Sequence, residues 1–226
     1  GAGCADIFLG PPVALPAIVP VEGASLDPLP AHTFPFEGGE ETIGIDPDPA
    51  VYAGAKGADR RLHLARDLSR EEWIPLYYRA FESEPHLEPF YADLLAALRD
   101  IRDREGLDDD RYLELIAVFV QSIPYRTDAS IVEPKFPIET YVDGEGDCDD
   151  RSLLLAGLLA REGYGVALFY FEDEAHMAVG VQSTGCHYRN TSLAYVETTN
   201  VSYVGIPPLA LSSGVVLASD PLVIPV

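Results

Sequence analysis

Apolar residues recur every three or four positions in three segments between residues 69 and 122, and this spacing predicts three amphipathic helices. The first begins at Ser69, where a capping-box sequence precedes the apolar run, and Pro85 ends it. The second covers residues 88–105. The third follows an acidic cluster, which suits a helix N-terminus electrostatically, and ends near residue 122. The apolar run of the first helix contains Trp73, Leu76, Tyr77 and Ala80. One face of the second carries Phe90, Leu94, Leu95 and Leu98, and the inward positions of the third are Leu113, Ile116, Ala117 and Val120.

The spacing of apolar residues along the chain changes after residue 146. Residues 123–146 contain three prolines and are predicted to be irregular, and a Leu-rich helix then runs from Cys148 to about residue 162. Apolar and polar residues alternate afterwards, which predicts strands at residues 166–172, 175–182, 186–188 and 195–199. Because helices come first and strands follow, we expect an α+β domain in which the Leu-rich helix packs on an antiparallel sheet.

The N-terminal part has a different composition. Six prolines fall within residues 1–31, so this segment is predicted to be an extended linker without a core of its own. Short alternating runs on either side of Gly38-Gly39 predict a β-hairpin. We therefore divide the chain into a Pro-rich tether (1–31), a hairpin and helices packed on the core (32–106), and the core itself (107–226).

The composition indicates which classes of partner the protein is expected to lack. The chain has 226 residues, enough to bury a core without disulfide staples, and a formal net charge of -22. A surface this acidic repels phosphate groups, so we expect no nucleic-acid partner and no attraction to anionic lipids. No run of 18 apolar residues is present, so no membrane span is expected. Three cysteines do not suggest a disulfide framework.

The first cysteine, Cys4, follows two small residues, as at the end of a bacterial-type lipobox. Lipidation at Cys4 would tether the protein to a membrane through the Pro-rich segment and place it outside the cytoplasm. The alternative is that small residues precede Cys4 by chance and the protein is cytoplasmic.

Cys148 stands where a Gly-rich segment becomes the Leu-rich helix. Asp147 can cap that helix, and exposed helix-end amides favour a thiolate in the first turn. The carboxylates of Asp147, Asp149 and Asp150 oppose a thiolate, although we expect them to support the site structurally. A reactive Cys148 therefore needs a protonated histidine beside it, and His176 is the candidate. The alternative is a buried structural cysteine.

His176 opens the strand predicted at residues 175–182, and small residues share its face. Glu197 lies in the last predicted strand. If the two strands are neighbours, Glu197 can accept a hydrogen bond from the imidazole and fix its tautomer. The alternatives are a structural histidine and an exposed carboxylate.

The backbone N–H of Cys148 is available to stabilise an oxyanion, and Gln121 and Tyr125 are further candidates. The acidic run around Cys148 could instead bind a hard cation such as Ca²⁺, but its spacing is not that of an EF-hand loop. We therefore expect neither a metal nor another cofactor to be required.

These segments resemble the transglutaminase-like superfamily, in particular a prokaryotic, often archaeal, branch. The resemblance covers roughly residues 34–208. It is carried by Gly146-Asp147-Cys148-Asp149-Asp150, Glu162-Gly163-Tyr164-Gly165, His176-Met177-Ala178-Val179-Gly180-Val181, Phe119-Val120-Gln121-Ser122-Ile123-Pro124-Tyr125, Pro137-Ile138-Glu139-Thr140 and Tyr195-Val196-Glu197-Thr198-Thr199.

The resemblance implies a papain-related α+β fold with Cys148 as nucleophile, His176 as general base and acid, and Glu197 as the orienting acid. The superfamily usually has aspartate in the third place, so the glutamate is a departure. The implied function is thiol acyl transfer on peptide or carboxamide bonds of a protein or peptide, by a cysteine peptidase, amidase or transglutaminase-like enzyme. The alternative is a catalytically inactive cell-surface module that binds cations, basic peptides or cell-wall material.

Overall fold

The computed structural model describes residues 13–64 and 67–226. Cys4 lies outside these residues. The helices are α1 (Pro49–Lys56), α2 (Arg70–Glu82), α3 (Glu88–Glu105), α4 (Asp109–Gln121), α5 (Pro137–Asp143) and α6 (Cys148–Arg161), with a 3-10 turn at Pro85–Leu87. The strands are β1 (Val13–Ala14), β2 (His32–Phe36), β3 (Gly39–Ile43), β4 (His63–Leu64), β5 (Val166–Phe171), β6 (His176–Gln182), β7 (Leu193–Val196) and β8 (Leu222–Pro225).

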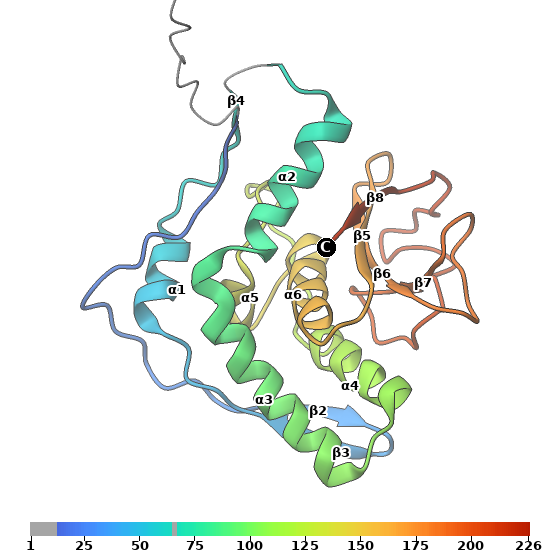
Figure 1. Ribbon diagram of the computed structural model, residues 1–226, viewed down its shortest axis with the longest axis horizontal. Coiled ribbons are helices and arrows are strands. Elements are labelled where there is room, and N and C mark those ends of the chain that lie inside the picture. Colours follow the sequence, from blue (N-terminus) through green and yellow to red (C-terminus); the bar gives the residue numbers. More distant parts are fainter. Residues whose placement is uncertain (1–12, 65–66) are drawn as a thin grey trace, which may run out of the picture.

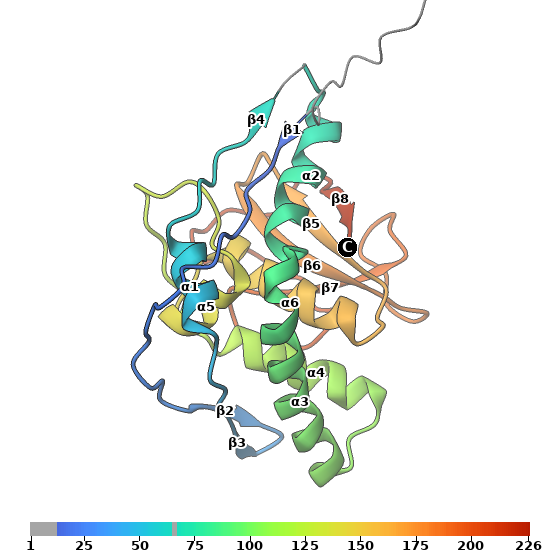
Figure 2. The same ribbon diagram turned by 60° about the vertical axis from the view of Figure 1, so that its left-hand side comes forward.

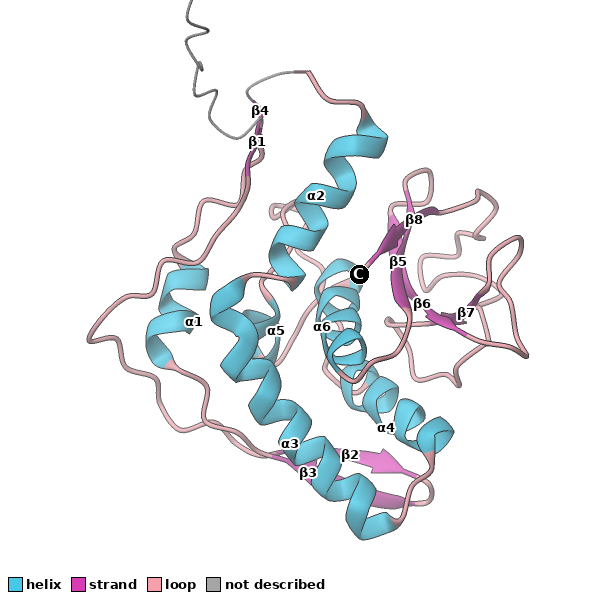
Figure 3. Cartoon of the chain, in the orientation of Figure 1, coloured by secondary structure: helices cyan, strands magenta, loops and turns pink. Residues whose placement is uncertain are grey.

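Helix α6 lies at the centre of the molecule, with the other helices on one side and a four-stranded antiparallel sheet on the other (Figures 1 and 3). The strand order in this sheet is β7-β6-β5-β8. Helix α6 contacts β5 and β6 as well as α2, α3, α4 and α5. Its residues are buried on all sides, as expected of a helix enclosed in a core. The expectation of an α+β domain with antiparallel sheets is confirmed.

The two faces of the sheet carry different apolar clusters. Met177 and Val179 of β6 belong to the main core, which includes α6. Ala178 belongs to a second cluster on the other face, with Phe169 and Phe171 of β5. The register pairs Phe171 with His176, so the histidine begins β6 on the side of this second cluster.

Several sequence-based boundaries are wrong for identifiable reasons. Residues 137–143, predicted to be irregular, form α5, because Pro137 occupies the first turn, where a proline is tolerated. Residues 186–188 do not form a strand, and β8, which was not predicted, pairs with β5. Strand β7 ends at Val196 rather than at residue 199. The three helices predicted between residues 69 and 122, the helix that begins at Cys148 and the hairpin are confirmed, with ends within about three residues of the expected positions.

The described part of the Pro-rich segment has an extended backbone but is packed against the rest of the protein. Strand β1 pairs with β4, and the side chain of Ile18 is 2% exposed within the main core. The Ile18 N–H donates to Glu84 Oε1 at 3.3 Å. A Cβ atom on Gly54 would lie 2.3 Å from the carbonyl oxygen of Val19, so α1 and this segment approach as closely as a glycine permits (Figure 2). Residues 13–31 thus differ from the free linker that the prolines suggested.

Candidate functional site

Cys148 is the first residue of α6, and its neighbours cap the helix reciprocally. Asp147 Oδ1 accepts from the Asp150 N–H at 3.1 Å, and Asp150 Oδ2 accepts from the Asp147 N–H at 3.1 Å. Gly146 is required before them, because a Cβ atom there would lie 2.8 Å from Asp150 Cβ. The thiol is therefore held at a well-defined helix start, where it is 8% exposed.

The environment of the thiol favours its neutral form. Cys148 Sγ lies 3.6 Å from Asp149 Oδ1, so the thiol proton is directed to a carboxylate. Burial, then the charges of Asp149 and Asp147, raise the pKa of the Cys148 thiol well above its usual value, and the Met177 N–H lowers it in part. Because Met177 follows His176 directly, the thiol lies next to the start of β6. The resting side chain is a thiol rather than a thiolate.

The pKa of the Asp149 carboxyl is also shifted. Burial, then the charges of Asp147 and Asp150, raise the pKa of Asp149 to about 7, although hydrogen bonds with Cys148 and Tyr78 lower it in part. The Tyr78 ring in α2 packs against Tyr170 with a centroid distance of 5.4 Å. Asp149 is therefore a titratable group near neutrality that directly contacts the candidate nucleophile.

His176 and Glu197 meet inside the protein, at 4% and 2% exposure. His176 Nε2 lies 3.5 Å from Glu197 Oε1 and 3.3 Å from the Tyr195 hydroxyl oxygen. The Tyr195 hydroxyl donates to Glu197 Oε2 at 2.9 Å, so tyrosine, histidine and carboxylate form one connected group. Sequence reasoning placed this histidine and glutamate together but missed Tyr195, although its i, i+2 spacing from Glu197 could have identified it.

The carboxylate of Glu197 is also tied to the backbone. Oε1 accepts from the N–H groups of Thr198 at 2.9 Å and Thr199 at 3.0 Å. These bonds divert both amides from the sheet and account for the early end of β7. Burial alone would raise the pKa of Glu197, but the hydrogen bond and charge of His176 and these N–H groups lower it to about 2. Glu197 is thus ionised across the physiological range.

Gln121, the last residue of α4, faces the same segment but not the thiol. Its amide donates to the carbonyl oxygens of Glu197 at 2.8 Å and Ser202 at 3.0 Å. Its amide oxygen accepts from the Ser202 N–H at 3.3 Å. Both amide protons are thus engaged, so this geometry makes Gln121 a support for the Glu197 segment rather than an oxyanion donor.

Tyr125 is brought to the start of α6 by a parallel bridge to Gly146. Its side chain is 41% exposed. Burial, then the charges of Cys148 and Asp147, raise the pKa of Tyr125 to about 12, so its hydroxyl keeps its proton near neutrality. Tyr125 therefore remains a candidate donor close to the thiol.

The acidic residues around Cys148 are engaged within the protein. Asp150 Oδ1 accepts from the Lys135 N–H at 2.7 Å, and Asp143 pairs with Lys56 and Lys135 at 2.6 and 3.1 Å. Burial, then the Asp147 charge, raise the pKa of Asp150 to about 6. Within residues 13–64 and 67–226, no three His, Cys, Asp or Glu side chains are grouped so that they could hold a metal ion.

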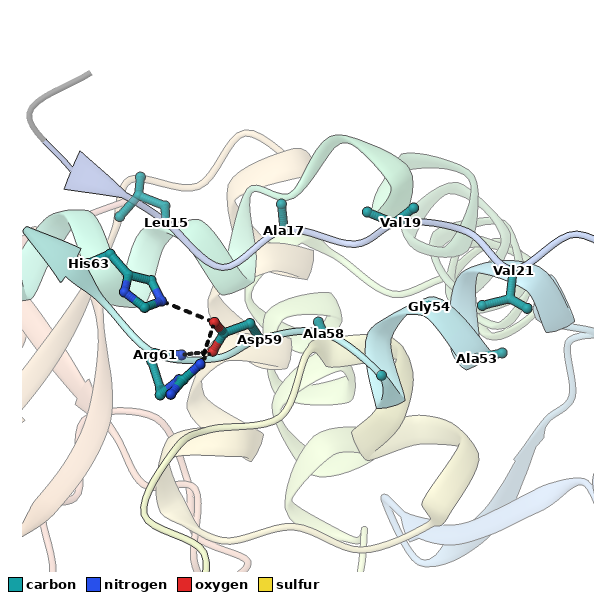
Figure 4. A pocket seen from close by; sticks show the side chains of 11 residues that line it. Leu15, Ala17, Val19, Val21, Ala53, Gly54, Ala58, Asp59, Arg61 and His63 are labelled. Carbon is teal, nitrogen blue, oxygen red and sulfur yellow. Dashed lines mark hydrogen bonds and ion pairs between the residues drawn. The ribbon is translucent and has the colours of Figure 1, made fainter. Parts of the chain in front are cut away.

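A small hollow lies beside the candidate site, and a larger one lies at the N-terminal segment. One, of about 110 Å³, lies at the start of α6 and is lined by Arg126, Asp128, Ile131, Glu133, Lys135, Glu145, Asp147 and Asp150. A larger one, of about 530 Å³, lies between the N-terminal segment and α1, where Asp59 bonds with Arg61 and His63 (Figure 4). Neither hollow is lined by Cys148 or His176.

Comparison with known proteins does not place this arrangement in a family. No model of a known protein family matches the chain, and no curated protein does so. None of the helices in the described part of the chain is both long and apolar enough to cross a membrane.

Proposed function

We propose that this protein is a thiol acyl-transfer enzyme that acts on peptide or carboxamide bonds of a protein or peptide. Cys148 is the nucleophile, His176 the general base and acid, and Glu197 the orienting acid. The observation that carries the proposal is the buried contact between His176 and the ionised Glu197 at the start of β6, where the backbone N–H of the next residue, Met177, faces the thiol of Cys148. A buried imidazole with an anionic partner can take up a proton at one nitrogen while the other stays oriented.

In the proposed reaction, the thiol proton passes to His176 as Cys148 sulfur bonds to the substrate carbonyl carbon. The carbon–nitrogen bond breaks, and His176 returns the proton to the leaving amine. Water, deprotonated by His176, then hydrolyses the thioester, or a second amine attacks it. The helix-start N–H groups would stabilise the oxyanion. We favour hydrolysis because it needs no second bound amine.

We propose that the core is papain- or transglutaminase-like. In such a core, a helix that begins with the nucleophile packs on the strand that begins with the base. Helix α6 and strand β6 contact each other in this manner. We further propose an extracytoplasmic location with a lipid anchor at Cys4. Glutamate in the third position is compatible with this role, because its carboxylate reaches His176, Tyr195 and two backbone amides.

The second candidate function is a binding module without catalysis. It is favoured by one observation: the thiol proton is directed to Asp149, and the thiol is almost fully buried. In such a module the acidic surface would bind cations, basic peptides or cell-wall material.

The deciding experiment measures iodoacetamide alkylation of Cys148 against pH by mass spectrometry, in the wild type and in His176→Ala. His187→Ala, which removes an exposed histidine, is the matched control, and the exposed Cys186 is an internal standard. Enzyme function predicts Cys148 alkylation that is much slower in His176→Ala than in the wild type and unchanged in His187→Ala. Alkylation with ordinary thiol pH dependence, unchanged in His176→Ala, would overturn it in favour of the binding module.

A further inference from the structure

Arg151 lies one helical turn beyond Cys148, on the same side of α6. Its side chain is 1% exposed, and it is the largest of the fully buried side chains in the described part of the chain. A buried guanidinium is costly unless hydrogen bonds and opposite charges compensate it. The hydrogen bonds and charges around the Arg151 guanidinium therefore indicate its role.

The hydrogen bonds of Arg151 join three elements. One terminal nitrogen donates to the carbonyl oxygen of Gln121, at the end of α4. The other donates to the carbonyl oxygen of Thr199 at 3.3 Å, in the bend that carries Glu197. Nε has no hydrogen-bond partner. Arg151 thus fastens the bend after β7 to the helix that begins with the nucleophile.

The charge of Arg151 faces the candidate site rather than a salt-bridge partner. None of the ion pairs among residues 13–64 and 67–226 includes Arg151. Burial lowers the pKa of Arg151 to about 10, whereas Glu197, Tyr125 and Cys148, in that order, raise it. The guanidinium carbon lies 5.7 Å from the centre of the Tyr125 ring, which covers it. Arg151 therefore stays charged near neutrality and interacts with the nucleophile and the orienting acid.

We infer that Arg151 is a positioning residue of the thiol centre: it fixes the bend that presents Glu197 to His176 and supplies the positive charge that offsets the carboxylates around Cys148. The inference rests on the proposed function. A thiolate can then form transiently among Asp147, Asp149 and Asp150, because a buried cation that interacts with Cys148 lies one turn further along the same helix.

The test compares Arg151→Lys with Arg151→Gln. Both keep an N–H donor for the carbonyls, but only lysine keeps the charge. The readout is the pH dependence of Cys148 alkylation by iodoacetamide in the full chain, with circular dichroism to verify folding. Arg161→Gln is the matched control, because Arg161 lies near the other end of α6 and pairs with Glu82 and Glu88.

We expect Arg151→Gln to alkylate about tenfold more slowly than the wild type at pH 7.5, with its curve displaced to higher pH. Arg151→Lys should stay within about threefold of the wild type, and Arg161→Gln should not move the curve. A folded Arg151→Gln with the wild-type curve, or a Lys variant as slow as the Gln variant, would overturn the inference. If Arg151→Gln does not fold, the Lys variant decides: a rate more than about tenfold below the wild type contradicts the inference.

Failure of the role of Arg151 can be told apart from failure of the proposed function. The proposed function is tested by the effect of His176→Ala on Cys148 alkylation, whereas the role of Arg151 is tested by the difference between the Lys and Gln variants. An unchanged rate in His176→Ala together with slow Arg151→Gln would reject the catalytic pair and keep the electrostatic role of Arg151.

Discussion

His176 Nε2 lies 3.5 Å from Glu197 Oε1, and the Tyr195 hydroxyl is within hydrogen-bonding distance of both side chains. The pair is buried, with Tyr195 in the second apolar cluster, whereas Cys148 belongs to the main core and meets the start of β6 at the Met177 N–H. This arrangement makes the carboxylate part of the fold as well as part of the candidate site. Its titration should therefore be visible in the stability of the protein.

We predict that Glu197 contributes stability that is lost in acid. The folded-state pKa of Glu197 is about 2, below its ordinary value of 4.5, so its contribution is complete above pH 4.5 and declines as the pH falls towards 2. Glu197→Gln should lower the free energy of unfolding by roughly 2 kcal/mol at pH 7 and by roughly 1 kcal/mol at pH 3. Urea denaturation at the two pH values measures this difference.

The control for this prediction is Glu40→Gln, which changes an exposed carboxylate on β3. It should shift the free energy of unfolding by less than about 0.5 kcal/mol at both pH values. An equal loss of stability at pH 7 and pH 3 in Glu197→Gln would mean that the variant disturbs packing rather than a charge.

Asp149→Asn should make Cys148 more reactive. The Asp149 charge and its hydrogen bond both raise the pKa of the thiol, so an amide at this position removes two obstacles to the thiolate. We expect alkylation of Cys148 to become several-fold faster at pH 8, as measured by mass spectrometry with the exposed Asp173→Asn as control. Slower alkylation would show instead that Asp149 accepts the thiol proton.

The same residue should give a pH-dependent stability of opposite sign to that of Glu197. The pKa of Asp149 is raised from 3.8 to about 7, so the native state holds a proton that the unfolded chain has lost. Stability then falls as the pH rises from about 4 to about 7. In Asp149→Asn this component should disappear, which would make the variant relatively more stable at pH 8 than at pH 4. Urea midpoints at the two pH values test it, and a constant difference would contradict it.

The sequence predicted the main architecture because its signals are local. Apolar periodicity located α3, α4 and α6, and alternation located β5 and β6. Alternation also predicted strands carrying His176 and Glu197 without showing that they are neighbours; Glu197 directly follows β7, and the structure brings the two side chains together. Asp147 was identified as the cap of α6 from its position alone.

The remaining features depend on contacts between distant segments. The local sequence does not indicate that both amide protons of Gln121 are donated to carbonyl oxygens beyond β7, or that Arg151 is buried. Glu197 accepts hydrogen bonds from the Thr198 and Thr199 N–H groups, and these bonds end β7 early in spite of the strand propensity of the residues. The sequence does not indicate these bonds either. The burial of Ile18 is another such case, because prolines report backbone conformation but not packing.

Ile18→Ala should destabilise the protein by about 3 kcal/mol. The side chain is 2% exposed within the main core, so its truncation removes buried methyl groups and leaves a cavity. Val19→Ala is the matched control, because Val19 is the next residue and is 76% exposed. It should cost less than about 0.5 kcal/mol by urea denaturation. Equal effects of the two variants would show that this segment is a free linker after all.

Gly157→Ala should also be destabilising, despite the better helix propensity of alanine. A Cβ atom at Gly157 would lie 2.2 Å from the hydroxyl oxygen of Tyr91, which donates to the Glu82 carbonyl at 2.9 Å. Arg161 covers the Tyr91 ring at 3.8 Å, so the ring cannot withdraw without breaking these contacts.

We expect Gly157→Ala to lower the free energy of unfolding by roughly 2 kcal/mol or more, as is typical of overpacking in a dense core. Gly185→Ala, which would meet no atom within 4 Å, should be nearly neutral in the same urea measurement. A double-mutant cycle identifies the cause: in a Tyr91→Ala background, where the obstructing ring is absent, Gly157→Ala should become neutral or stabilising. A penalty that persists without the ring would locate the strain in α6 itself rather than in its contact with α3.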